Sequence, residues 1–144
     1  MTVIRPGDEF LREPYWQHLA EGTLHLNCCN DCGSAHHPPS PICPKCRSFN
    51  TGWKPATGKG TLKSFAVARH AVHPLLADQV PYVITLVDLE EGVRMVSGIP
   101  QGMDVDLKIG MPLECKVIRI DDRLALPYFL PVDEAGNATT EVPD

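Results

Sequence analysis

The sequence predicts a mainly β protein, with short helices confined to its N-terminal part. The chain of 144 residues contains 14 prolines and 11 glycines, which favour many short segments joined by turns. Four of its six cysteines form two C-x-x-C pairs, a spacing typical of a small metal-bound ribbon. Residues 61–132 then contain a succession of short apolar, β-branched segments without a long helical pattern. A ribbon followed by a strand-rich domain is therefore expected.

Residues 1–22 are expected to form an N-terminal helical segment. Within it, residues 8–22 indicate two short helices, because Pro14 is tolerated in the first turn of a second helix. Gly22 then supplies a natural stop. We expect the apolar face of this segment either to pack against the rest of the chain or to dock a partner protein. The face consists of Phe10, Tyr15, Trp16 and Leu19.

A zinc ribbon is predicted at residues 23–50, entered through a short strand at residues 23–26. Two thiolates on each tight turn can reach the same tetrahedral ion, and a set of four sulfur ligands suits Zn²⁺. Because four thiolates leave no coordination position for water or substrate, we expect a structural zinc rather than a catalytic one. The predicted ligands are Cys29, Cys32, Cys43 and Cys46.

The cysteines also admit other interpretations. A disulfide framework needs an oxidising compartment, and residues 1–10 lack the apolar stretch of a signal peptide, so we expect a cytoplasmic protein. One C-x-x-C pair alone would suit redox chemistry, but two pairs this close favour a shared metal. Cys28 competes with Cys29 as the first ligand, although Cys29 keeps the two-residue spacer. His36 and His37 are expected in a solvated loop.

Residues 51–60 are expected to form a hinge, and residues 61–132 a closed or nearly closed barrel of OB type. A change in the apolar phase near Ile118 predicts a β-bulge in the fourth strand of this barrel. Residues 133–144 hold four acidic residues and no basic one, so they are expected to be a disordered tail. The five expected strands are 61–69, 81–89, 93–99, 113–120 and 125–130.

The charge balance limits the classes of partner. The formal net charge is −5, and a zinc ion bound by four thiolates would make it two units more negative. An acidic chain repels a phosphate backbone unless its basic residues gather on one face. The charge balance therefore disfavours nucleic acid as a binding partner. No apolar run approaches the roughly 18 residues of a membrane span, so no membrane partner is expected. We also find no convincing set of catalytic side chains in the sequence.

The order of the motifs resembles a known family. The series consists of Tyr15-Trp16, Cys29-x-x-Cys32-Gly33, Pro38-Pro39, Cys43-Pro44-x-Cys46-x-Ser48, Trp53, Gly58-x-Gly60, Ser64, Pro81-Tyr82, Gly92-Val93, Gly110-Met111 and Pro127-Tyr128-Phe129. Over residues 10–132 it resembles the small proteins built from a rubredoxin-like zinc ribbon and an acyl-CoA-associated OB-fold. Cys28 departs from the family pattern, which commonly has a basic or polar residue before the first ligand.

The resemblance implies a non-catalytic accessory subunit that binds or scaffolds a thiolase-like or lipid-transfer-type enzyme, with acyl-CoA as a ligand. Lys59, Lys63 and Arg69 are candidate contacts for the phosphates of CoA, and solvated surface charge is the alternative. Two other function classes stay open. One is a zinc-ribbon and OB-fold module that binds single-stranded nucleic acid. The other is a stand-alone acyl-CoA enzyme such as a thioesterase.

Overall fold

The computed structural model describes residues 3, 13–133 and 135, and its strands confirm the mainly β class. Phe10, the first of the two expected helices and nearly all of the expected acidic tail lie outside the described residues. The elements are α1 (Glu13–Ala20), β1 (His25–Cys29), β2 (Ala35–His36), β3 (Thr51–Pro55), β4 (Lys59–Ala68), the 3-10 helix η1 (Pro74–Gln79), β5 (Tyr82–Leu89), β6 (Arg94–Gly98), β7 (Pro112–Arg119) and β8 (Ala125–Pro131).

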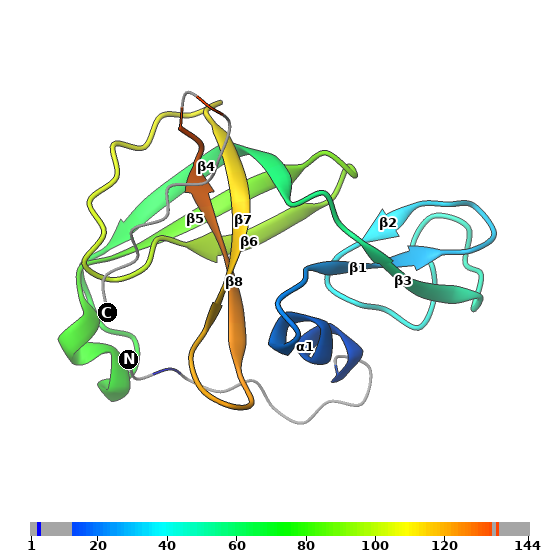
Figure 1. Ribbon diagram of the computed structural model, residues 1–144, viewed down its shortest axis with the longest axis horizontal. Coiled ribbons are helices and arrows are strands. Elements are labelled where there is room, and N and C mark those ends of the chain that lie inside the picture. Colours follow the sequence, from blue (N-terminus) through cyan, green and yellow to red (C-terminus); the bar gives the residue numbers. More distant parts are fainter. Residues whose placement is uncertain (1–2, 4–12, 134, 136–144) are drawn as a thin grey trace.

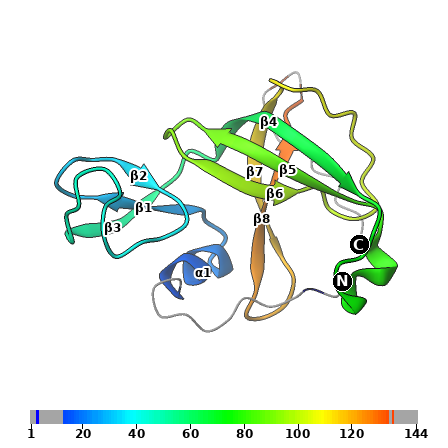
Figure 2. The ribbon, with the colours of Figure 1, turned by 180° about the vertical axis from the view of Figure 1, so that it is seen from behind.

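Two antiparallel sheets lie side by side (Figure 1). The first has the strand order β2-β1-β3 and forms the zinc ribbon, with α1 beside it. The second has the order β6-β5-β4-β7-β8 and curls into a nearly closed barrel, which Figure 2 shows from behind. This arrangement confirms the expected ribbon followed by a five-stranded barrel.

The ends of helix α1 follow from its sequence. Pro14 is the second helical residue, where its missing N–H is not needed. The helix ends before Gly22, which has a φ of 89° and donates its N–H to the Leu19 carbonyl oxygen at 2.9 Å. A left-handed residue at this position is the usual glycine stop signal. Both expectations about this helix are therefore confirmed.

The connection between the ribbon and the barrel is shorter than expected. Residues 51–55 are not part of a hinge, because they form β3 and pair with all of β1, from His25↔Pro55 to Cys29↔Thr51. Only residues 56–58 remain between the two sheets. The Thr57 N–H donates to Glu91 Oε1 at 2.6 Å, which ties this connection to the turn after β5.

The expected β-bulge lies in a different strand. Pairing of β7 with β8 is continuous from Leu113↔Pro131 to Arg119↔Ala125, whereas the irregularity lies in β4, between Leu62 and Ser64. β4 pairs with β7 only over residues 112–114. Beyond that point the described pairing of β7 is with β8, and it is regular through Ile118, so the phase change in the sequence does not mark a bulge.

One hydrophobic core runs through both sheets. Its buried residues come from α1, from the region of β1 and from the barrel strands, so neither sheet completes its core alone. Alternation along β1 turns Leu26 and Cys28 toward this core and places Cys29 on the opposite face. The core includes Tyr15, Leu19, Leu24, Leu26, Cys28, Leu62, Val87, Met95, Leu113 and Phe129.

Candidate metal centre

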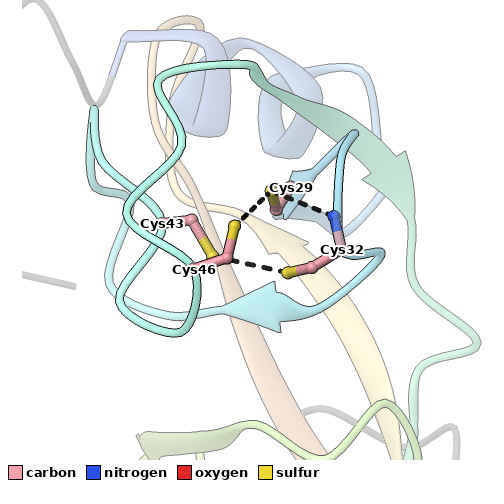
Figure 3. A group of neighbouring side chains, drawn as sticks. All are labelled: Cys29, Cys32, Cys43 and Cys46. Atoms are coloured by element: carbon pink, nitrogen blue, oxygen red, sulfur yellow. Dashed lines mark hydrogen bonds between the residues drawn. The ribbon is translucent and has the colours of Figure 1, made fainter.

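Four cysteine side chains converge at one end of the ribbon (Figure 3). All four sulfur atoms lie within 4.8 Å of one another. The Sγ atoms of Cys29 and Cys46 are 3.5 Å apart, and those of Cys32 and Cys43 are 3.7 Å apart. A tetrahedral ion with Zn–S bonds of about 2.3 Å holds its sulfurs about 3.8 Å apart. The geometry therefore fits one zinc ion held by four thiolates.

The two C-x-x-C knuckles have the same backbone hydrogen bonds. In each, the first cysteine accepts a bond from the N–H four residues later and donates its own N–H to the serine carbonyl five residues later. The residue that supplies the first bond is left-handed in both knuckles, with φ of 75° at Gly33 and 64° at Arg47. The four bonds, each 2.9 Å long, are Gly33 N to Cys29 O, Arg47 N to Cys43 O, Cys29 N to Ser34 O and Cys43 N to Ser48 O.

This repeat gives a matched pair of variants. Gly33→Ala is expected to destabilise the protein by about 1 kcal/mol, because alanine is strained at positive φ. The space around the added Cβ is open, so the cost is conformational and not steric. Arg47→Ala is expected to have little effect, because a residue with a Cβ already occupies that conformation. Urea denaturation of both variants measures the difference, and equal midpoints would contradict the prediction.

Ser34 favours the ionised form of two of the four cysteines, Cys32 and Cys43. Its Oγ lies 3.0 Å from the Cys32 sulfur and 3.5 Å from the Cys43 sulfur. The Ser34 hydroxyl, with the backbone N–H of Cys46, lowers the pKa of Cys43 to about 5. Hydrogen bonds from Ser34 also lower the pKa of Cys32. Thiolates are the form that binds metal, so this residue supports the site, although our sequence reasoning did not single it out. Its position two residues after a knuckle, which Ser48 repeats, is the signal that would have found it.

The structure separates Cys28 from the four converging sulfurs. Cys28 is buried in the shared core, where its thiol donates to the Leu26 carbonyl oxygen at 3.6 Å. The geometry thus favours Cys29 as the first ligand. His36 is buried on β2 rather than solvated, and its Nε2 lies 3.5 Å from the Ser40 carbonyl oxygen.

Asn27 organises the loop between the knuckles. Its side chain donates to the Gly52 carbonyl oxygen at 3.0 Å, and its Oδ1 accepts the Ser40 N–H at 3.0 Å. These bonds tie the loop to β3 and hold the second knuckle near the first. A polar residue between Leu26 and Cys28 in a buried strand was the available signal for this role.

The apolar face of α1 is mostly a packing face. Tyr15 is 6% exposed and Leu19 is fully buried, so neither is available to a partner, which corrects the docking interpretation for these two residues. Trp16 is half-buried, and its ring packs edge-on against Tyr15 with centroids 5.0 Å apart. Only Trp16 of the described part of this face remains a docking candidate.

The structure does not gather the three basic residues proposed to contact phosphates. Lys59 begins β4 and Arg69 follows its end, so at the rise of a strand they lie about 30 Å apart. All three side chains are exposed. A single phosphate group cannot contact all of them, and their role in binding CoA stays a prediction.

Comparison with known proteins follows the same division into two parts. Residues 16–52 match the model described as "ChsH2, rubredoxin-like zinc ribbon domain", and residues 53–119 match "ChsH2, C-terminal OB-fold domain". This chain belongs to the ChsH2 family. Its zinc-ribbon and OB-fold domains, together with the four neighbouring cysteines, support a structural zinc.

Relatives of the chain include both small proteins and parts of larger ones. It is 34% identical to a "DUF35 domain-containing scaffold protein" of Methanocaldococcus jannaschii, over 74% of this chain and 77% of that protein. It is 36% identical to a "Probable enoyl-CoA hydratase alpha subunit" of Thermomonospora curvata, over 90% of this chain. The match spans only 40% of that longer protein.

A solved structure has the same fold at similar sequence identity. The structure titled "Ltp2-ChsH2(DUF35) aldolase" contains a chain that is 35% identical, with a TM-score of 0.77. The match covers 88% of this chain and 98% of that chain. Among the described residues, no helix is both long enough and apolar enough to cross a membrane.

Proposed function

We propose that this chain is a non-catalytic accessory subunit, which binds and scaffolds a thiolase-like or lipid-transfer-type enzyme acting on acyl-CoA. The names of its relatives support a subunit role, since one is called a scaffold protein and another is part of an aldolase complex. Four thiolates would complete the coordination of a zinc ion, so the ion would hold the ribbon together without contacting a substrate.

An exposed apolar hairpin carries this proposal. We call residues 64–84 the hairpin arm; it comprises the outer parts of β4 and β5 and the connection between them, which contains η1 (Figure 2). Phe65 and Val67 on β4 are 40% and 45% exposed, and Val72 in the connection is 79% exposed. Phe65 and Val67 are two residues apart on β4 and so share one face of it, and contiguous exposed apolar surface usually marks a protein interaction site. The arm is therefore the surface that we expect the partner enzyme to cover.

Co-purification tests the proposal. The tagged full-length chain, expressed in its native host, is expected to recover a thiolase-like or lipid-transfer-type protein identified by mass spectrometry. Val67→Asp is expected to lower that recovery at least tenfold, because a carboxylate in an apolar interface loses its hydration. Val96→Asp is the matched control, because Val96 is also an exposed strand valine but lies outside the arm.

Two results would contradict the proposal. One is the absence of any such protein from the recovered material. The other is turnover of an acyl-CoA by the purified chain alone, abolished by a substitution outside the four cysteines, which would establish an enzyme instead of an accessory subunit.

A further inference from the structure

A groove of about 870 Å³ lies between the ribbon and the open edge of the barrel. Helix α1 contributes Tyr15 and Trp16, and the loop after β2 contributes Pro38. The barrel contributes parts of β5, β6 and β8, the loop after β6, and Leu76 and Gln79 of η1. Since one wall comes from α1 and the loop after β2 and the other from the barrel, the groove exists only when the N-terminal part and the barrel are folded together.

A proline in β8 limits backbone pairing with β6 beside the groove. Ile120 and Leu124 form a hydrogen-bonded pair, because the Ile120 N–H donates to the Leu124 carbonyl oxygen at 2.8 Å. Hydrogen-bonded and non-hydrogen-bonded pairs alternate along β7 and β8, so the backbone polar groups of residue 127 point away from β7 and toward β6. Pro127 has no N–H to donate there, so a ladder with β6 cannot form fully. A side-chain bond joins the two strands instead, from the Ser97 hydroxyl to the Pro127 carbonyl oxygen at 2.9 Å.

The lining of the groove is apolar and almost without charge. Arg94 is the one residue with a permanent charge among the described residues that line it. Asp88 neutralises this guanidinium through two contacts, Nε to Oδ1 at 2.5 Å and Nη2 to Oδ2 at 3.1 Å. An occupant would therefore meet neither a free cation nor a free anion. The most buried apolar residues that line the groove are Tyr15, Met95 and Ile99.

The volume and the apolar lining of the groove suit a small molecule. Its volume lies within the roughly 300–1,000 Å³ of typical small-molecule sites, which are concave and lined mainly by apolar and aromatic side chains. A neutral apolar cavity excludes a charged headgroup from its interior and accepts hydrocarbon. The volume and the neutral lining of the groove therefore both indicate a small molecule with a hydrocarbon part.

We infer that this groove binds the hydrocarbon part of a small-molecule ligand, such as the acyl group of a thioester. The inference rests on the acyl-CoA part of the proposed function and deepens it, but it needs no partner enzyme. The groove shares Leu76, Gln79 and residues 81–84 with the hairpin arm, but the exposed arm residues Phe65, Val67 and Val72 lie outside the groove. Separate substitutions can therefore test ligand binding and partner docking, and each can fail without the other.

Titration of the isolated full-length chain tests the inference. Trp53→Phe leaves Trp16, which lines the groove, as the sole tryptophan and thus as a local fluorescence reporter. Butanoyl-, hexanoyl- and octanoyl-CoA are titrated beside free CoA, with fluorescence and calorimetry as readouts. The Kd is expected to fall about fourfold for each buried methylene. Free CoA is expected to bind at least tenfold more weakly than octanoyl-CoA.

Two aspartate variants locate the site. Val96→Asp places a charge in the groove lining, where Val96 is 68% exposed, so the substitution should spare the fold. It is expected to raise the Kd of octanoyl-CoA at least tenfold. The matched Val67→Asp, outside the groove, is expected to leave this Kd unchanged while it reduces partner recovery.

Several results would overturn the inference. Affinity that does not depend on chain length, or a Val96→Asp variant that binds octanoyl-CoA normally, would show that hydrocarbon does not enter the groove. Loss of partner recovery in Val96→Asp without loss of ligand binding would make the groove a protein interface. In contrast, failure of the chain to recover any partner, with chain-length-dependent binding intact, would remove the proposed accessory role and leave the groove site standing.

Discussion

Replacement of Cys32 by serine, or removal of the metal with a chelator, is expected to unfold the zinc ribbon. Binding of zinc to a site of four thiolates supplies about 10–16 kcal/mol of folding free energy. A whole domain of this size commonly has a free energy of unfolding of only about 5–15 kcal/mol. Loss of the zinc-binding free energy is therefore expected to unfold the ribbon. Because Leu26 and Cys28 belong to the core shared with the barrel, the barrel should be destabilised as well.

Metal content by elemental mass spectrometry, together with the far-UV circular dichroism melting curve, measures this effect. The wild-type chain is expected to hold about one zinc ion and Cys32→Ser almost none. Cys115→Ala is the control, because this half-buried cysteine lies on β7, outside the four converging sulfurs. A Cys32→Ser protein with an unchanged melting temperature would show that the site does not stabilise the fold.

Replacement of Leu19 by alanine is expected to lower the free energy of unfolding by about 2–5 kcal/mol. Leu19 is fully buried in the core between α1, the ribbon and the barrel, so the shortened side chain leaves a cavity that its neighbours fill only in part. Gln17→Ala, at an exposed position of the same helix, is expected to change stability by less than about 0.5 kcal/mol.

Urea denaturation of both α1 variants measures the difference, and co-purification with the partner is measured beside it. A Leu19→Ala protein that keeps wild-type stability but loses its partner would restore the docking interpretation of this face. The expected result is the reverse, because a side chain without exposed surface cannot contact a partner directly.

Local patterns in the sequence predicted most of the fold. The C-x-x-C spacing acts within one tight turn, and strand alternation acts within one segment, so both can be read without knowledge of distant residues. The ribbon, the five barrel strands and the stop at Gly22 were all predicted on this basis. The resemblance to a zinc-ribbon and OB-fold family was confirmed by the matches at residues 16–52 and 53–119.

Errors arose where distant segments decide the structure. Residues 51–55 look like a connection in the sequence, but β1 offers them a complete antiparallel partner and they form β3. The apolar phase change near Ile118 suggested a bulge, whereas β7 pairs regularly with β8 at that position. For the apolar face with Tyr15 and Leu19 the sequence left packing and docking open, and the surface that covers it comes from β1 and the barrel.

The sequence by itself determined the two knuckles, the order of the elements and the class of metal site, because each depends on residues close together in the chain. Only the tertiary structure decided that Cys29 and not Cys28 joins the other three sulfurs, because β1 turns Cys28 toward the shared core and Cys29 toward the opposite face. It alone revealed the groove, whose walls join Trp16 to Leu126. Contacts over such separations depend on how the ribbon packs against the barrel, and no local pattern encodes that packing.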